Sequence, residues 1–474
     1  MSILSRALGA LAEAPINAIS NMAESIWRTS PKRQGYHSDF LPPTDLASRY
    51  NFGFSITGNR FLTTKISHTH CLAMGASGTG KTVSVGLPSA YNLIKNGHSI
   101  CIHDPSGELL YKISGYATAK GYRIVVLNFA DATVSDGWNP LHRAHCMSDY
   151  MKICSALVRN ALGKGGDNAF WNVQATSFLA LMCGIAKTLG GEYNNFANVK
   201  QLVELFIIDS KKIDALIAKS GEPELIQEYK LFLSLDQRVM SNVIATCRAA
   251  CSLWVDNHIK TMTSFDTIDF ASFRKEKTIL FIRTNTADMQ YYSVLTSLFM
   301  QQFFGSIMEQ LPEKKDKHIF FIIDEASSIY LPETLQIALS NLRKYNSGIL
   351  LILQDYNQLR HLYGNAQAEA IKTNCYTRIY FPGQPIDVCR DLEQMLGKYQ
   401  YEDKQGRSQT RQLLTADEIQ TMEEDHALIF CTGKRACYAK MKPYYRHWKY
   451  NGYSKYPLPE LTSKVPFDTV PLFR

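Results

Sequence analysis

The chain has 474 residues, of which 45% are hydrophobic and 20% charged, an ordinary composition for a globular protein of two or three domains. The formal net charge of +8 is spread without a long basic run, so it permits contact with a polyanion but does not indicate one. The eleven cysteines occur singly, at spacings that fit neither a zinc ribbon nor a redox pair, and we interpret them as buried residues of a protein in a reducing compartment.

The first 27 residues contain no secretory signal, because Arg6, Glu13 and Pro15 interrupt the apolar positions. No stretch of the chain reaches the roughly eighteen uncharged apolar residues of a membrane span, which predicts a soluble or peripheral protein. The apolar residues of this segment recur at helical spacing and fit an amphipathic helix that binds a membrane surface or a partner. A helix packed on its own protein, or a loosely ordered arm, fits equally well, so residues 1–58 are predicted as an N-terminal arm.

Residues 61–129 alternate short apolar runs with helical patterns. Residues 82–96 and 108–120 predict helices, the first of them bent or interrupted by Pro88, and strands are predicted by the runs FLTTKI, HCLAM, HSICIH and YRIVVLNF. This alternation is typical of a parallel sheet covered by helices.

The pattern changes over residues 148–273, where apolar residues recur every three or four positions and no strand pattern is found. Strand patterns return in TILFIRT, HIFFIID, GILLILQD and TRIYF. The sequence therefore predicts one α/β domain formed by residues 59–147 and 274–442, with an inserted all-α domain formed by residues 148–273. Residues 443–474 are predicted to form an extended tail on the surface.

The motif GASGTGKT fits the pattern G-x-x-x-x-G-K-[ST] of a loop that wraps a triphosphate, and it lies between a predicted strand and a predicted helix. In such a loop, Lys81 adds a positive charge at the β- and γ-phosphates, and Thr82 can supply a hydroxyl ligand to Mg²⁺. A glycine-rich turn without a ligand is the simpler alternative. We expect the ATP-binding residues to be Gly75, Ala76, Ser77, Gly78, Thr79, Gly80, Lys81 and Thr82.

Two further predicted strands end in polar side chains that would complete this site. In HIFFIIDEAS, we expect Asp324 to hold Mg²⁺ with Thr82, and Glu325 to polarise the attacking water as general base. In GILLILQD, we expect Gln354 to sense the γ-phosphate and to lie beside Asp324 if the two strands are neighbours. Alone, the acidic pair would fit a helix cap and the glutamine a loop. Together and in this order, the motifs predict a RecA-like P-loop ATPase domain.

The ordered set of motifs resembles the coupling-protein ATPases of type IV secretion and conjugation. Besides GASGTGKT, IIDEAS and ILLILQDYNQLRHLYG, the resemblance rests on HDPSGEL at residues 103–109, GWNPL at residues 137–141, and the pair Phe170 and Trp171. It spans about residues 59–440, and the ordered set is far more specific than any one motif.

The resemblance also implies an arginine that acts on the active site of a neighbouring subunit, and Arg343 occupies its place. A cation near a helix C-terminus is the alternative for this residue. Two features depart from the family. Ser106 stands where the family has the lysine of D-P-K-G-E, and the pair of membrane-spanning helices with which family members begin is not found in this sequence. An anchor would then come from another chain.

The resemblance implies an ATPase that uses ATP and Mg²⁺, forms a homo-hexamer on assembly and is mainly monomeric in isolation. Its cargo would be a DNA–relaxase complex or effector proteins, docked with or without an adaptor on the inserted domain and delivered to the components of a type IV secretion channel. Its expected place is the bacterial cytoplasm, at the cytoplasmic face of the inner membrane, beside a separate anchor protein.

Two alternatives stay open. A DNA-pumping ATPase of the septal-translocase or HerA type shares the ATPase motifs, but GWNPL and HDPSGEL favour the coupling protein. A receptor platform that binds nucleotide without hydrolysing it is disfavoured by the intact Lys81, Asp324 and Glu325.

Overall fold

A computed structural model describes residues 38–162, 169–331, 334–402, 405–466 and 470–473. The predicted amphipathic helix of residues 1–27 lies outside these residues and stays a prediction. Among the helices of the described residues, none is long and apolar enough to cross a membrane.

The centre of the molecule is a mixed sheet of nine strands in the order β11-β10-β7-β1-β6-β5-β2-β4-β3. The strands from β7 to β3 are parallel, and β10 and β11 are antiparallel additions at one edge. Their bounds are β1 (Cys71–Met74), β2 (Ser99–His103), β3 (Arg123–Asn128), β4 (Thr278–Arg283), β5 (Ile319–Ile323), β6 (Ser347–Leu353), β7 (Thr377–Tyr380), β10 (His426–Cys431) and β11 (Cys437–Lys440).

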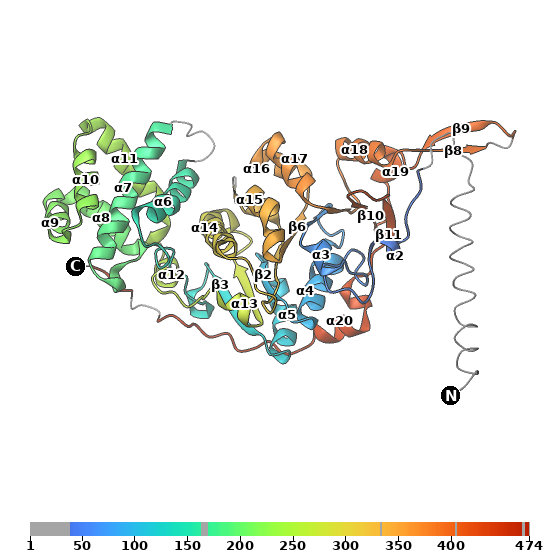
Figure 1. Ribbon diagram of the computed structural model, residues 1–474, viewed down its shortest axis with the longest axis horizontal. Helices are drawn as coiled ribbons and strands as arrows, with labels where there is room; N and C mark the ends of the chain where they lie inside the picture. Colours follow the sequence, from blue (N-terminus) through green and yellow to red (C-terminus); the bar gives the residue numbers. More distant parts are fainter. Residues whose placement is uncertain (1–37, 163–168, 332–333, 403–404, 467–469, 474) are drawn as a thin grey trace.

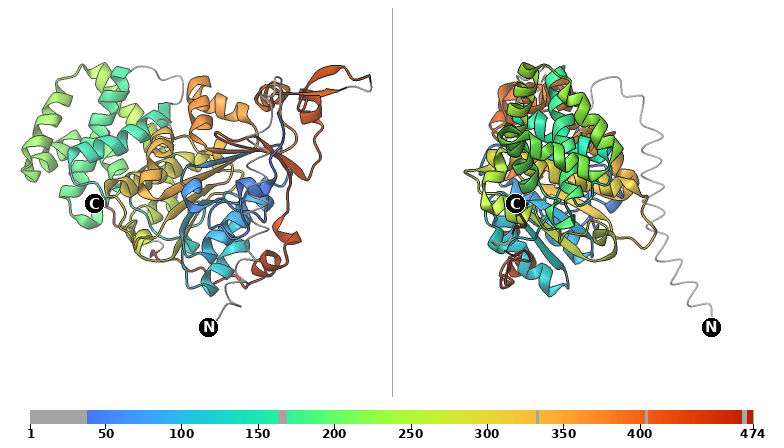
Figure 2. Two further views of the ribbon diagram at one scale, coloured as in Figure 1. Left: turned by 45° about the vertical axis from the view of Figure 1, so that its right-hand side comes forward. Right: turned by 90° about the vertical axis from the view of Figure 1, so that its left-hand side faces the viewer.

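The central strands are apolar on both faces because helices cover both sides of the sheet (Figure 2). Leu72 and Met74 of β1 belong to one hydrophobic cluster, whereas Cys71 and Ala73 belong to another. One face packs on α4 (Leu87–Lys95), α5 (Glu108–Ala119) and α20 (Trp448–Tyr453). The other packs on α14 (Met289–Glu309), α15 (Thr334–Asn341), α16 (Tyr356–Tyr363), α17 (Asn365–Asn374) and α18 (Ile386–Leu396).

The described residues between β3 and β4 contain no strand, as the sequence predicted. Most of them form a bundle of helices that extends from the sheet (Figure 1). Phe178, Phe196 and Trp254 are fully buried in this bundle. Its main helices are α6 (Met147–Leu162), α7 (Ala169–Thr188), α8 (Phe196–Ile208), α9 (Ser210–Ser220), α10 (Pro223–Leu233) and α11 (Gln237–Ala250). The short helices α12 (Asn257–Met262) and α13 (Ser272–Lys275) follow as the chain returns to β4.

Two local predictions need correction. The run FLTTKI is not a strand: Phe61 makes isolated bridges, and α3 (Thr64–Ser67) follows because the hydroxyl of Thr63 accepts a hydrogen bond from the backbone N–H of Ile66. The helix predicted over residues 82–96 is present but not uniform: it begins as a π-helical turn, η1 (Thr82–Gly86), and continues as α4, with Pro88 next to the junction.

Part of the segment predicted as an N-terminal arm packs into the ATPase domain. Phe54 and Ile56 are fully buried, and the backbone N–H groups of Phe54 and Ser55 donate to the hydroxyls of Ser67 and Ser89. The division of the chain into domains otherwise remains a prediction.

The tail predicted as extended over residues 443–474 begins with helical turns. Residues 444–446 form a short 3-10 helix, and α20 follows with Tyr450 buried against Tyr91. The chain then runs along the lower edge of the molecule to the all-α domain (Figure 1). There the side chains of Asn198 and Gln201 donate to the carbonyls of Pro471 and Phe473. We call the described tail residues, 457–466 and 470–473, the strap.

Candidate functional site

The GASGTGKT loop connects β1 to η1 at the carboxyl edge of the sheet. Gly78 and Gly80 have φ values of +80° and +91°, which side chains rarely adopt. A Cβ at Gly75 would lie 2.4 Å from the Cβ of Phe381, so only glycine fits there. These features leave the backbone of the loop free to curve around a ligand.

Lys81 is buried within this loop, and its ammonium donates to the carbonyls of Gly75 (2.5 Å) and Ala76 (2.7 Å). Burial lowers the pKa of Lys81, while the carboxylates of Glu325 and Asp324 raise it. The ammonium thus lies in the cradle of the loop with two acidic groups nearby, where an anionic ligand would complement its charge.

The second polar group of the site follows β5. The hydroxyl of Thr82 donates to Asp324 at 3.2 Å, so the two expected metal ligands lie side by side. Glu325 has a left-handed backbone (φ 55°), an uncommon conformation for this residue type that turns the chain sharply after the strand. A strained backbone conformation of this kind is typical of residues at functional sites.

Strand β6 lies between β1 and β5, which brings Gln354 to the acidic pair. Its amide donates to one carboxylate oxygen of Glu325 at 2.6 Å, and the hydroxyl of Ser327 donates to the other at 2.5 Å. Glu325 is therefore held from two sides. The sequence predicted Gln354 beside Asp324, and the structure places its amide on the next residue, Glu325.

A second pair of buried groups, contributed by the end of β2, supports Asp324. The ring Nδ1–H of His103 donates to the carbonyl of Asp324 at 2.8 Å, which fixes the tautomer of this histidine. Asp104 accepts from the backbone N–H of Leu110 at 2.7 Å. Burial, together with the neighbouring charge of Asp104, raises the pKa of Asp324 to about 7, although the hydrogen bond from Thr82 opposes the rise. Such a carboxyl gains most from a cation placed beside it.

The loop, the acidic pair and Gln354 line one open cavity of about 990 Å³. Its walls also come from the start of α5, the start of α14 and the helix α16, which contribute Glu108, Gln290 and His361. A cavity of this size accommodates a nucleoside triphosphate.

Arg343 is not part of this cavity. It lies in η7 (Leu342–Tyr345), before β6 and therefore at the amino edge of the sheet, where its side chain is exposed. The structure thus separates Arg343 from the site of its own chain, as an arginine that acts across subunits requires.

Arg283, at the end of β4, lies close to Gly107, the residue after Ser106. Gly107 (φ +78°) allows the guanidinium to approach so closely that a Cβ there would lie 2.6 Å from Nη2. The charge of Arg283 opposes the rise in pKa that burial imposes on Asp104. Arg283 therefore supplies a cation next to the position where the family has lysine.

Sequence reasoning missed His103, Asp104, Arg283 and Ser327 as residues of the site. HDPSGEL was noted only for its resemblance, yet its first two residues follow a strand and could have been placed at the same edge as Asp324. Arg283 offered no comparable signal, because its proximity to Asp104 depends on the pairing of β2 with β4.

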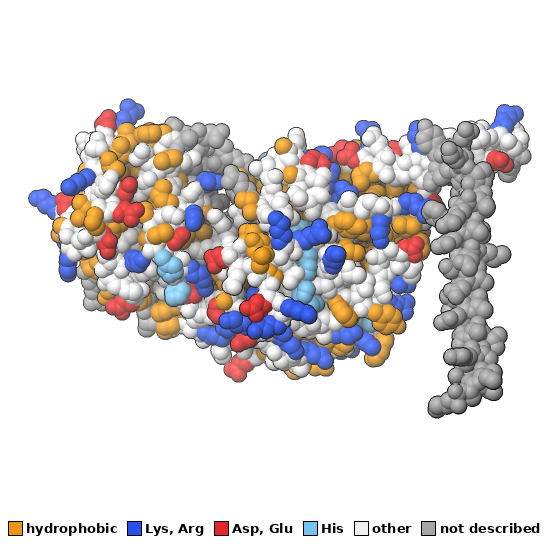
Figure 3. Space-filling model, in the orientation of Figure 1, with side chains coloured by type: hydrophobic (Ala, Val, Ile, Leu, Met, Phe, Trp, Pro, Cys, Tyr) orange, Lys and Arg blue, Asp and Glu red, His pale blue; other side chains and the backbone are white. Residues whose placement is uncertain are grey.

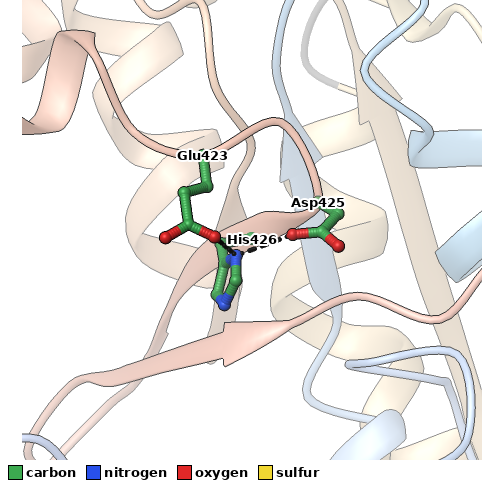
Figure 4. Close-up of side chains that lie close together, drawn as sticks. All are labelled: Glu423, Asp425 and His426. Atoms are coloured by element: carbon green, nitrogen blue, oxygen red, sulfur yellow. Dashed lines mark ion pairs between the residues drawn. The ribbon is translucent and has the colours of Figure 1, made fainter.

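A separate polar cluster of Glu423, Asp425 and His426 lies beside β10 (Figure 4). Nδ1 of His426 is 2.8 Å from Asp425 and 3.0 Å from Glu423, and Asp425 also pairs with Lys440 at 2.8 Å. The ring of His426 stacks on Tyr438. These contacts describe a surface ion-pair network that joins β10 to β11.

Residues 44–466 match the protein family described as type IV secretory system conjugative DNA transfer. The chain belongs to this family. Among curated relatives, it is 19% identical to Protein VirD4 of Agrobacterium fabrum over 397 residues, covering 77% of this chain and 57% of that protein. The chain therefore spans somewhat more than half the length of this relative.

The fold is that of the bacterial conjugative coupling protein TrwB. A sulphate-bound structure of a truncated TrwB superposes with a TM-score of 0.70 at 17% identity, covering 92% of this chain and 97% of that one. The TrwB complex with ADP and Mg²⁺ superposes with a TM-score of 0.69 at 17% identity, covering 87% and 96%. The predicted fold class, a RecA-like P-loop ATPase domain with an all-α domain, is confirmed.

Proposed function

We propose that this protein is an ATP-hydrolysing coupling protein that recruits a DNA–relaxase complex or effector proteins and delivers them to a type IV secretion channel. The observation that carries the proposal is the convergence of Lys81, Thr82, Asp324, Glu325 and Gln354 on one cavity. Family membership and the TrwB fold support the assignment of this cavity to a nucleotide.

Each side chain has a distinct role in the proposed reaction. Lys81 and the loop N–H groups of residues 75–82 bind the phosphates, and Thr82 and Asp324 would hold Mg²⁺, whose charge stabilises the developing negative charge on the phosphoryl oxygens. Glu325 orients and polarises the attacking water, and Gln354 keeps the carboxylate of Glu325 in place.

The donor set fits this metal. A hydroxyl and a carboxylate are hard oxygen ligands of the kind that Mg²⁺ prefers, and Thr82 and Asp324 are already within 3.2 Å of each other. The TrwB complex that contains ADP and Mg²⁺ supports the same pair of cofactors for this protein.

The all-α domain is the proposed docking surface for cargo or an adaptor. We also propose that six copies assemble at the cytoplasmic face of the bacterial inner membrane, beside a separate anchor protein and the channel components, while the isolated chain is mainly monomeric. Arg343 then enters the site of the neighbouring copy.

The two alternative functions are less well supported. A DNA pump is disfavoured because the family match includes the helical domain. A non-hydrolysing platform is disfavoured because the carboxylate of Glu325 is held in the site by hydrogen bonds.

Two substitutions test the proposal by separating binding from hydrolysis. Lys81→Ala removes a phosphate contact, so both the affinity for ATP and the turnover should fall. Glu325→Gln keeps the contacts to metal and phosphate, so ATP should bind with near wild-type affinity while turnover falls by about 100-fold or more.

Phosphate release and titration with a fluorescent ATP analogue measure the two effects, with and without single- and double-stranded DNA. Lys95→Ala, at the exposed end of α4, is the matched control. Turnover of Glu325→Gln at the wild-type rate would refute the base assignment. Absence of turnover in the wild-type chain under every condition, including assembled secretion components, would favour the platform.

A further inference from the structure

Two segments far apart in sequence carry cations and no acidic residue of their own. Residues 46–66 and 438–456 contain no Asp or Glu, and the second segment carries five Lys or Arg residues. The backbone N–H of Lys442 donates to the carbonyl of Thr57 at 2.8 Å, and the rings of Phe61 and Tyr450 are 6.4 Å apart. The charge of Arg49 also contributes to the lowered pKa of His447. The two segments therefore lie side by side.

Large aromatic side chains project from these two segments. The exposed fractions are 85% for Tyr50, 53% for Phe52, 51% for Tyr445 and 78% for Trp448. Leaving several such rings in water is unfavourable, by an amount that grows with the apolar area exposed. Among the described residues, the ammonium of Lys449 lies 5.2 Å from the centre of the Trp448 ring. The ring nevertheless remains largely exposed.

Exposed and half-buried cations belong to the same two segments. We define the aromatic–basic patch by its four aromatic residues together with Arg49, Lys442, Arg446 and Lys449. In the space-filling view, Lys and Arg side chains alternate with hydrophobic ones over the region of α20 (Figure 3). Tyr and Trp beside Lys and Arg are the residues that favour the boundary between water and the headgroups of a bilayer.

We propose that the aromatic–basic patch binds the surface of an anionic phospholipid bilayer. The rings insert among the headgroups, and the cations pair with the lipid phosphates. Proteins also use aromatic rings and cations to bind single-stranded nucleic acid, but they do so in a groove that follows the strand. The patch lies instead on a helix and a loop, and no residue of it lines the nucleotide cavity.

The position of the patch agrees with this use. Its helix α20 packs beside α5 on the lower side of the sheet, and the helices α6 to α11 lie at the left of the view (Figure 1). The patch therefore does not include the proposed docking domain. The proposal refines the membrane-peripheral location given above, but it needs neither hydrolysis nor cargo.

Sedimentation with vesicles tests the patch in the full chain. Wild-type protein should bind vesicles that contain about one-third phosphatidylglycerol in phosphatidylcholine, bind pure phosphatidylcholine weakly, and dissociate as salt is raised. The double variants Tyr50→Ser/Trp448→Ser and Arg446→Glu/Lys449→Glu should each lose about tenfold or more in affinity for the anionic vesicles.

The matched controls substitute residues of similar type and exposure at another place on the surface. Phe170→Ser and Lys211→Glu/Lys212→Glu alter exposed residues of the all-α domain and should bind vesicles as the wild type does. A blue shift of tryptophan fluorescence on vesicle addition should disappear in Trp448→Phe. The nucleotide affinity of each variant reports folding, and it should be unchanged whether or not the proposed delivery function is correct.

Three outcomes would overturn the proposal. Vesicle affinity that is unchanged in both patch variants would place any lipid contact elsewhere. A loss of affinity for single-stranded DNA without a loss of affinity for vesicles would make the patch a nucleic-acid surface. A change only in concentration-dependent self-association would make it a contact between copies of this chain.

Discussion

At the residue scale, the site depends on a carboxylate that other side chains hold in place. Glu325 accepts one hydrogen bond from Gln354 and one from Ser327, so both of its oxygens are oriented before any water reaches them. A general base that is already oriented requires little reorganisation during the reaction.

We therefore predict that Gln354→Leu lowers the turnover number of ATP by about tenfold or more while changing the KM less than threefold, because the substitution frees Glu325 without removing a phosphate contact. Steady-state phosphate release measures both parameters. Gln336→Leu, which removes an exposed amide on α15, is the control. A pure KM effect would show that Gln354 acts by binding nucleotide.

At the element scale, the amino edge of the sheet contains a histidine cluster. Nε2 of His68 lies 3.0 Å from Nδ1 of His318, and the rings of His98 and His318 are 5.1 Å apart. Burial is the main cause that lowers the pKa of His68 to about 3 and that of His98 to about 4, and the proximity of His318 contributes to both values. These rings are neutral in the folded protein over most of the acidic range.

We predict that the free energy of unfolding decreases as the pH falls from about 6.5 towards 4. In this range the unfolded chain binds protons at these histidines, whose ordinary pKa is about 6.5, and the folded chain does not. The upper limit is about 3 kcal/mol for a histidine whose pKa falls from 6.5 to about 4. Urea denaturation at several pH values measures the slope.

His68→Gln and His98→Gln should each flatten this slope, and His145→Gln, at an exposed position, should not. A slope that persists unchanged in both cluster variants would assign the acid sensitivity to other groups.

The elements that sequence reasoning predicted correctly are those with strong local signals. The strands β1, β2 and β3, and later β5 and β6, are apolar on both faces and end at a polar motif, so both their type and their position could be read from the sequence. FLTTKI was misassigned because a local cap at Thr63 outweighs strand propensity. The pair β10 and β11 and the hairpin of β8 (Lys398–Glu402) and β9 (Ser408–Gln412) were not predicted, because their register depends on antiparallel partners.

At the scale of the whole molecule, the site is incomplete in one copy if Arg343 belongs to a neighbour's site. We predict that Arg343→Ala binds ATP normally and hydrolyses it at least about tenfold more slowly in the assembled state. Mixing Arg343→Ala with Lys81→Ala subunits should restore part of the activity, because an intact loop can meet an intact arginine at some interfaces.

Phosphate release across a series of mixing ratios measures this rescue. Lys344→Ala, whose side chain is also exposed in η7, is the control for charge. The absence of rescue at every ratio would argue against action across subunits.

The all-α domain can be tested in the same way. A chain lacking residues 148–273 should retain nucleotide binding, because its cavity is lined by other segments, and should lose delivery of cargo in a transfer assay. Normal delivery by this deletion variant would remove the docking role from the domain.

The strap forms a further attachment between the α/β domain and the all-α domain, in addition to the two chain crossings that join them. Asn198 and Gln201 hold the chain end on α8, while the other end of the strap continues from α20, whose Tyr450 packs on Tyr91. Between these ends, the backbone N–H of Lys464 donates to the carbonyl of Ser135, and the ammonium of Lys464 pairs with Asp136 at 2.8 Å. A displacement of the all-α domain that preserves these bonds is therefore resisted beside β3, by an attachment additional to the two chain crossings.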